Sequence, residues 1–180
     1  MSLEKVTVKK LEAAKRQLHT AITLWFADCD HVSVHTLACA AHQIVDDINK
    51  NKKGTELLFD SSVIRNEFRK EYFNYMREAM RFFKHADKDP DPSGTIEFAP
   101  AITELFILFT IIGLERFGEC LTETTTAFIL FYGIKNPHLV AKEFNDRFKI
   151  KDLTDLPVVS KREFFKQFLL IRNVGWVSDA

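Results

Sequence analysis

Apolar residues recur at steps of three and four along most of this chain, a spacing typical of α-helices. In the first segment, which we expect to form a helix over about 7–27, they are Leu11, Ala14, Leu18, Ala21, Ile22 and Trp25. Asp30 is placed to cap a second helix over about 31–49, because an aspartate at this position accepts a hydrogen bond from the backbone. Only the short turn 28–30 separates the two segments, which predicts an antiparallel helical hairpin.

A third helix is predicted from the cap candidates at 60–62 to about residue 86. Its apolar stripe consists of Ile64, Phe68, Tyr72, Tyr75, Ala79 and Phe82. The segment 87–94, DKDPDPSG, breaks this helix, and Pro100 suits the first turn of a fourth helix over about 99–118. Because the fourth helix is apolar nearly all round, it is predicted to lie either at the centre of the bundle or in a homodimer interface.

Shorter helices are expected in the last third of the chain. Residues 121–133 are rich in Thr and aromatic residues, which a strand would also accept, but a lone strand would have no partner, so we favour a helix. A short helix over about 137–148 follows, and the Ser160–Glu163 capping box precedes a last helix. The sequence therefore predicts an all-α, up-and-down bundle of five to seven helices. It forms a single domain, 1–180, with a C-terminal helical extension at about 137–172.

Charge, hydropathy and cysteine usage exclude several classes of protein. The 25 Lys+Arg residues balance 25 Asp+Glu, so no overall basic excess marks a nucleic-acid binder, and any such activity would need a local patch. The longest apolar run, 105–114, has about half the ~20 residues that span a bilayer, and we expect no membrane segment. Three scattered cysteines and the lack of a recognisable signal peptide favour a cytoplasmic protein. No cofactor is expected.

The C-terminal end of the third helix carries the main candidate site. Arg77, Arg81 and His85 are spaced by four residues, so they share one face of a helix, and Lys84 and Asn74 lie beside them. Such a cationic cluster can hold a phosphate, and the imidazole can act as general acid or base toward a ribose 2′-hydroxyl. The alternative is structural, since cations in a last turn also complement the helix dipole.

A second candidate is a stripe of potential metal ligands on the second helix. His31, His35, Cys39, His42 and Asp46 fall within an arc of about 80°, expected at the boundary between core and water. Two histidines four residues apart can bind zinc or iron. The favoured interpretation is that these groups form hydrogen bonds between helices, with no metal site.

The hairpin, the long third helix and the Arg-to-His segment 81–85, RFFKH, resemble the HEPN superfamily over about 7–133. The hairpin leading into 33–38, SVHTLA, is also similar. The resemblance implies a small helical bundle, often a dimer, of a bacterial defence or toxin–antitoxin system. Active members are metal-independent ribonucleases with an Arg, four to six residues and a His, so it implies catalytic roles for His85 and for Arg81 or Arg77.

The spacing departs from that pattern. Three residues separate Arg81 from His85 and seven separate Arg77 from His85, and Phe82 stands where a polar residue usually follows the Arg. A noncatalytic or altered member is therefore as consistent with the chain as a ribonuclease.

The function predicted from the sequence is binding of RNA or a nucleotide in a cleft near His85. Arg77, Arg81 and Lys84 would contact phosphates, and His35 and His42 would line the cleft, with metal-independent transesterification if the RNA is cleaved. The alternatives are a noncatalytic module that docks a partner protein and a metal-binding protein that uses the stripe of His31, His35 and His42.

Overall fold

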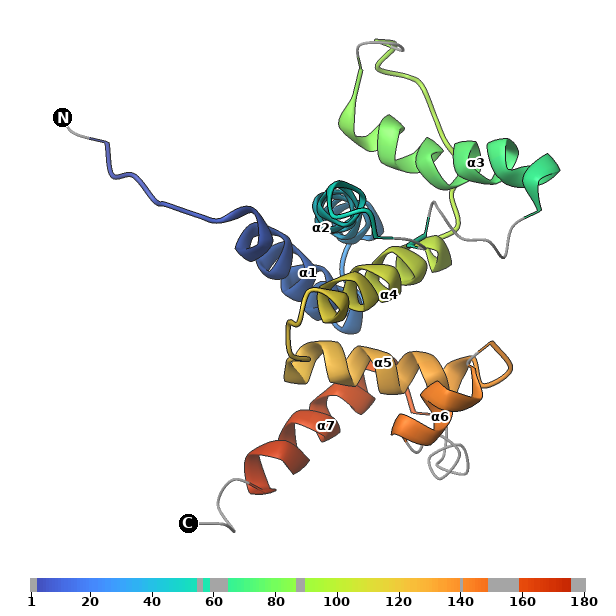
Figure 1. Ribbon diagram of the computed structural model, residues 1–180. Helices are drawn as coiled ribbons and strands as arrows, with labels where there is room; N and C mark the ends of the chain where they lie inside the picture. The colour runs from blue at the N-terminus through green and yellow to red at the C-terminus, as the bar shows by residue number, and fades with distance from the viewer. Residues whose placement is uncertain are drawn as a thin grey trace.

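The computed structural model describes residues 3–54, 57–58, 65–86, 90–139, 141–148 and 159–175. These residues form helices and loops without a strand, which confirms the predicted all-α bundle (Figure 1). The helices are α1 (Lys10–Phe26), α2 (His31–Asn51), α3 (Asn66–Lys84), α4 (Ala101–Arg116), α5 (Glu123–Lys135), α6 (Lys142–Phe148) and α7 (Lys161–Gly175). None of the helices in this part of the chain combines the length and apolar character that crossing a bilayer requires.

The predicted hairpin of α1 and α2 is present. Asp28 adopts a positive φ of 56°, which turns the chain sharply. The Asp30 carboxylate then accepts a hydrogen bond of 2.7 Å from the backbone N–H of Ser33, so the expected N-cap of α2 is confirmed.

Helix α4 lies at the centre of the bundle, packed mainly against α2 (Figure 1). Phe106, Ile107 and Ile111 are almost fully buried. Gly113 allows the close approach, because a Cβ atom there would collide with the side chain of Val45 on α2. Of the two positions predicted for this apolar helix, the structure shows the central one, so its hydrophobicity does not require a second copy of the chain.

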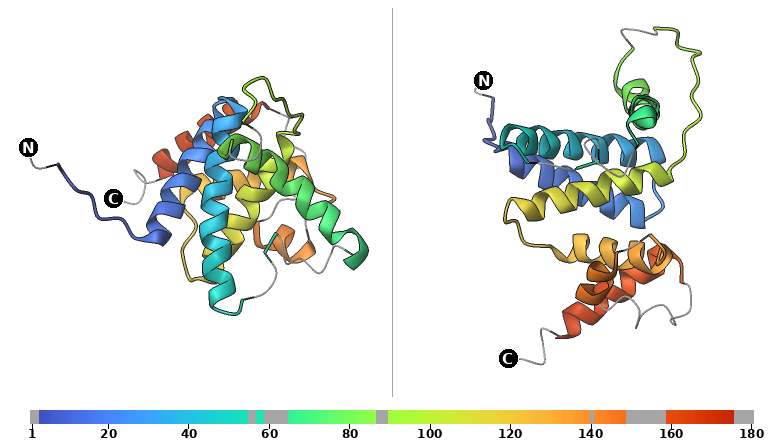
Figure 2. Two further views of the ribbon diagram at one scale, coloured as in Figure 1. Left: turned by 90° about the horizontal axis from the view of Figure 1, so that it is seen from above. Right: turned by 45° about the vertical axis from the view of Figure 1, so that its right-hand side comes forward.

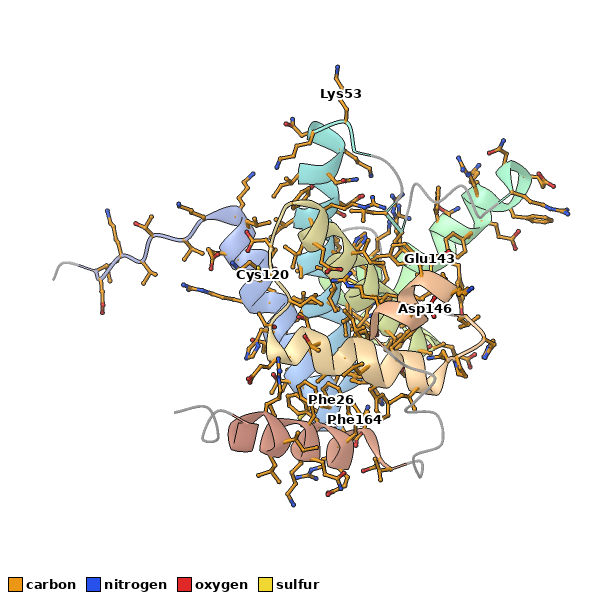
Figure 3. The ribbon with its side chains drawn as sticks, turned by 60° about the horizontal axis from the view of Figure 1, so that its bottom comes forward. Phe26, Lys53, Cys120, Glu143, Asp146 and Phe164 are labelled. Atoms are coloured by element: carbon orange, nitrogen blue, oxygen red, sulfur yellow. The ribbon has the colours of Figure 1, made fainter. Side chains whose placement is uncertain are left out.

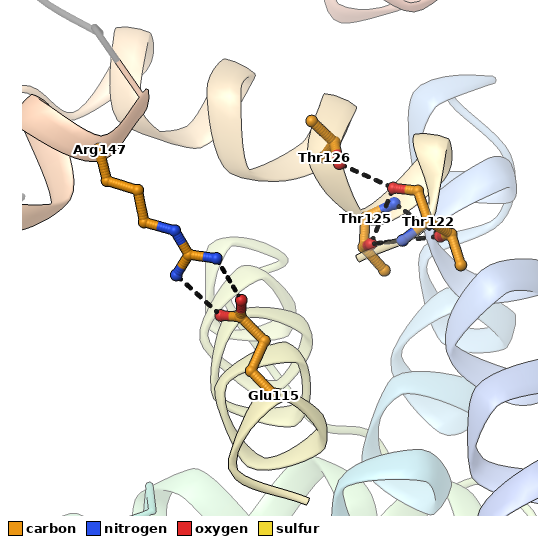
Figure 4. A network of polar contacts seen from close by, with 5 residues as sticks. All are labelled: Glu115, Thr122, Thr125, Thr126 and Arg147. Carbon is orange, nitrogen blue, oxygen red and sulfur yellow. Dashed lines mark hydrogen bonds and ion pairs between the residues drawn. The ribbon is translucent and has the colours of Figure 1, made fainter. Parts of the chain in front are cut away.

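Residues 123–135 form the helix that was favoured over a strand. Thr122 caps α5 through a reciprocal hydrogen-bonded box with Thr125, and Thr126 also bonds to the Thr122 carbonyl (Figure 4). The same figure shows Arg147 of α6 paired with Glu115 of α4 at 2.5 Å. The short helix α6 is therefore tied to the central helix by an ion pair.

Helix α7 packs on the end of α1 through aromatic rings. Phe165 stacks on Phe26 with ring centroids 4.4 Å apart, and Phe164 lies parallel to the same ring at 6.3 Å (Figure 3). Lys161 adds an ion pair to Asp28 and lies over the ring of Trp25. Ser160 accepts the backbone N–H of Glu163, as the capping box predicted.

Helix α3 is placed differently from the others. It crosses the outside of α2 rather than running along it (Figures 1 and 2). The described residues 90–100, which we call the hoop, lead to the start of α4 without forming a helix. Only Met76 and Ala79 of α3 are buried, whereas Phe68 and Tyr75 are each 53% exposed and Phe82 is 38% exposed. The apolar stripe predicted for this helix therefore lies only partly in the core. The cap candidates at 60–62 and Ile64 lie outside the described residues.

Candidate functional site

An open hollow of about 1910 Å³ lies between α3 and the returning segment of the hoop. One wall consists of α3 side chains, and residues 91–96 of the hoop contribute the other. Gln43 of α2 reaches its floor. The sequence did not predict that residues 91–96 form the second wall of the hollow, because they follow no helical pattern.

Four of the predicted site residues line this hollow: Asn74, Arg81, Lys84 and His85. Arg81 and Lys84 occupy the last turn of α3 and His85 is its C-cap. The His85 backbone N–H donates to the carbonyl of Arg81 at 2.9 Å, and the chain leaves the helix there in an extended conformation. Three potential cations thus lie at the negative end of the helix dipole, and all three side chains are exposed to solvent.

Arg77 points elsewhere. It is half-buried, its guanidinium carbon lies 5.8 Å from the centre of the Phe73 ring, and it is not among the residues of the hollow. Its charge acts on His42 of α2, whose pKa it helps to lower. The prediction that Arg77 shares one surface with Arg81 and His85 is therefore not met.

His35 is buried in an aromatic cage rather than lining a cleft. Its ring contacts those of Phe83, Phe98 and Phe106 at centroid distances of 5.3–5.8 Å. Its Nδ1 lies 2.9 Å from the hydroxyl of Thr103. Burial lowers the pKa of His35 to about 4, so the ring is neutral near neutral pH. His35 thus joins α2, the end of α3, the hoop and α4.

His42 is also buried, two turns further along α2 and on nearly the same side as His35. Its ring lies edge-on to Phe106 at 5.3 Å. Burial, followed by the charges of Lys50 and Arg77, lowers the pKa of His42 to about 4. The expectation that His35 and His42 line the candidate cleft is wrong, because the gap between α2 and α4 is filled by aromatic side chains.

The candidate ligands of the α2 stripe differ widely in their exposure to solvent. His31 is exposed, while His35, Cys39, His42 and Asp46 are buried, so the stripe does not follow the core boundary as expected. The Cys39 thiol lies 3.3 Å from Nε2 of His35, and burial raises its pKa, which disfavours the thiolate that metals bind. No group of three or more His, Cys, Asp or Glu side chains suited to a metal occurs among the described residues.

Near the C-terminal end of α2, Oδ1 of Asp46 and Nδ2 of Asn49 are buried without a hydrogen-bond partner among the residues that the structure describes. The other carboxylate oxygen of Asp46 accepts from Lys50 at 2.8 Å. Asp46 and Asn49 are 1% and 2% exposed. This end of α2 therefore carries a polar group that its packing does not satisfy.

Sequence reasoning missed the mixed charge of the hollow. Glu67, Glu71 and Glu78 line it along α3, together with the exposed rings of Phe68 and Tyr75. The available signal was the seven-residue spacing of these rings within the apolar stripe of the third helix. The cations Arg81 and Lys84 therefore lie at the C-terminal end of α3, whereas acids, aromatic rings and one further cation, Lys70, line the rest of the hollow.

Comparisons with known proteins add no relative. No protein-family model matches the chain. No curated protein matches it, and no solved structure does either.

Proposed function

We propose that the C-terminal end of α3 binds RNA or a nucleotide through its phosphate groups. The observation that supports this proposal is that Arg81, Lys84 and His85 line the same open hollow. Guanidinium groups bind phosphate with two parallel hydrogen bonds, and lysine adds a point charge, so two cations one turn apart suit a phosphodiester. Asn74, on the same wall, supplies an amide for a base or ribose.

Cleavage would follow from His85. Its imidazole would accept the proton of a ribose 2′-hydroxyl as that oxygen attacks the adjacent phosphorus, and Arg81 would stabilise the charge that develops on the phosphoryl oxygens. The bond from phosphorus to the 5′-oxygen of the next nucleotide would break, that oxygen would take a proton from solvent water, and a 2′,3′-cyclic phosphate would remain. This is a metal-independent transesterification, the reaction that the HEPN resemblance implies. Under this proposal the protein is a ribonuclease of a defence or toxin–antitoxin system.

Binding is tested by fluorescence anisotropy with a labelled RNA oligonucleotide and with labelled ATP at low salt. We expect Arg81→Ala to weaken binding about tenfold and Lys84→Ala by somewhat less, with both effects shrinking as salt rises. Lys166→Ala, which removes an exposed cation on α7, is the matched control and should bind like the unmodified protein. Equal affinity in all four proteins, or no binding in any, would overturn the proposal.

Cleavage is tested separately with His85→Ala. We expect this variant to keep most of its RNA affinity while RNA degradation and growth arrest on expression disappear. If the unmodified protein binds RNA but leaves it intact, the binding proposal stands and the ribonuclease proposal is rejected.

A second candidate function, a noncatalytic module that docks a protein, is favoured by the exposed rings of Phe68, Tyr75 and Phe82. Exposed aromatic rings in one row are typical anchors of protein interfaces. This function predicts that aromatic substitutions abolish binding of a copurifying protein, whereas His85→Ala leaves it unchanged.

A further inference from the structure

The N-terminal half of α3 presents an acidic–aromatic face, which we define as Glu67, Phe68, Glu71, Tyr75 and Glu78. At 100° per residue these five positions fall within an arc of about 100°, and all five line the hollow. Phe68 and Tyr75 lie about 10 Å apart along the helix and are both 53% exposed. Lys70 also lines the hollow, about 160° from Phe68 on the helix. Within the defined face, the rings of Phe68 and Tyr75 occupy one edge and the three glutamates occupy the other.

The described chain before α1 has the complementary chemistry. Residues 3–9 form an extended arm with no secondary structure, in which Leu3 is 82%, Val6 is 76% and Val8 is 44% exposed. In an extended chain Val6 and Val8 point to one side, while Lys5 and Lys9 point to the other. The arm thus offers an apolar edge of Val6 and Val8, with Glu4 at its start, and an opposite edge that carries Lys5 and Lys9.

The arm leaves the molecule on the side away from α3 in every view (Figures 1 and 2). Seven extended residues span about 23 Å, against about 17 Å for the stretch of α3 from residue 67 to 78. One copy of the chain therefore holds two exposed surfaces that face apart, an arm with two lysines and a helix face with three glutamates, of which Glu67 also pairs with Arg65.

We propose that the arm of one copy packs on the acidic–aromatic face of a second copy, and that the two copies exchange arms. Val6 and Val8 would cover the rings of Phe68 and Tyr75, and the lysines would pair with Glu71 and Glu78. A two-fold axis makes the two contacts identical, which closes the assembly as a dimer. The contact uses residues other than Arg81, Lys84 and His85, so it does not depend on the proposed function.

The first test is the oligomeric state, measured by sedimentation equilibrium over a wide range of protein concentration. The full chain should form a dimer, and a chain lacking residues 1–8 should be monomeric. The truncation keeps Lys9, whose carbonyl accepts the first helical hydrogen bond from Ala13, so α1 keeps its N-terminus. A monomer at all concentrations, or a dimer that survives truncation, would overturn the proposal.

Charge reversal gives a second test. Glu71→Lys with Glu78→Lys should weaken the dimer at least about tenfold, and so should Lys5→Glu with Lys9→Glu. A mixture of the two double variants should form a heterodimer, because each arm then meets a face of opposite charge. The matched control is Glu143→Lys with Asp146→Lys, two exposed acids of α6, and should leave the dimer unchanged (Figure 3). Failure of the mixture to associate would contradict the assigned contact.

Cross-linking decides whether the arm docks on its own chain or on another. The exposed cysteines are replaced by Cys29→Ser and Cys120→Ser, while Cys39 is buried. Val6→Cys with Tyr75→Cys should then give a covalent dimer under mild oxidation, visible on a non-reducing gel. A disulfide confined to single chains would show that the arm folds back on its own α3 and would overturn the exchange.

Discussion

Helices α2 and α3 have similar lengths, 21 and 19 residues, and both carry an apolar stripe, yet α2 buries nine residues and α3 only two. Helix α2 lies between α1 and α4, which cover it on two sides, whereas α3 rests on α2 along one side only. Periodicity predicts that a helix has an apolar face, but the number of its neighbours decides how much of that face is covered. The covered helix stabilises the fold, and the partly covered one leaves side chains available for binding.

The largest expected difference between these regions is in core truncation. Phe106→Ala removes a fully buried ring that contacts His35 and His42 of α2, and should lower the free energy of unfolding by about 4 kcal/mol. Phe68→Ala, on the open side of α3, should change it by less than about 0.5 kcal/mol. Urea denaturation at neutral pH measures both. Similar losses in the two variants would show that α3 is covered as fully as α2.

The pH dependence of stability sharpens the comparison for the buried side of α2. Because burial lowers the pKa of His42 to about 4, the unfolded chain binds a proton below about pH 6.5 and the folded one does not. Stability should therefore fall as the pH decreases from about 6.5 to 4, by about 3 kcal/mol for this residue over the whole window. His42→Gln should remove that part of the slope, measured by urea unfolding at several pH values in this range. A slope identical in the variant and the unmodified chain would mean that His42 is accessible to protons in the folded state.

The smallest effect concerns helix ends. Thr122→Ala removes the capping box of α5 and should cost about 1 kcal/mol of global stability. Helix α3 has no side-chain cap, since Arg65 stands at its N-cap without a hydrogen bond to the backbone. Arg65→Thr should therefore slow amide hydrogen exchange within α3 while leaving the exchange of α2 unchanged. Equal slowing in both helices would indicate that α3 unfolds only together with the bundle.

Most of the fold could be predicted from the sequence, because the helices are specified locally. Asp30, Thr122 and Ser160 occupy N-cap positions, and the observed ends of α1, α2, α4 and α5 lie within three residues of the predicted ones. The short helix α6 begins later than expected, at Lys142. The apolar pattern does not show which helices pack against one another, so it did not predict the exposure of Phe68.

The candidate site could also be predicted only in part, because the sequence gives positions along a helix and not the elements that pack against them. Arg81, Lys84 and His85 gather at one end of one helix, which spacing alone determines. Arg77 lies only about 40° from Arg81 on an ideal helix, but the border between the side that faces α2 and the open side runs between them. The burial of His35 and His42 required the rings of Phe83, Phe98 and Phe106, which come from three later segments and leave no trace in the periodicity of α2.

Asp46 and Asn49 carry buried polar atoms that lower the stability of the bundle. A buried polar atom that loses its water without gaining a partner costs about 1–3 kcal/mol, and α2 holds two of them one turn apart. Apolar residues of similar volume at these positions would remove that cost, together with the ion pair between Asp46 and Lys50. We expect such a change to raise the melting temperature at a place that neither the hollow nor the arm touches.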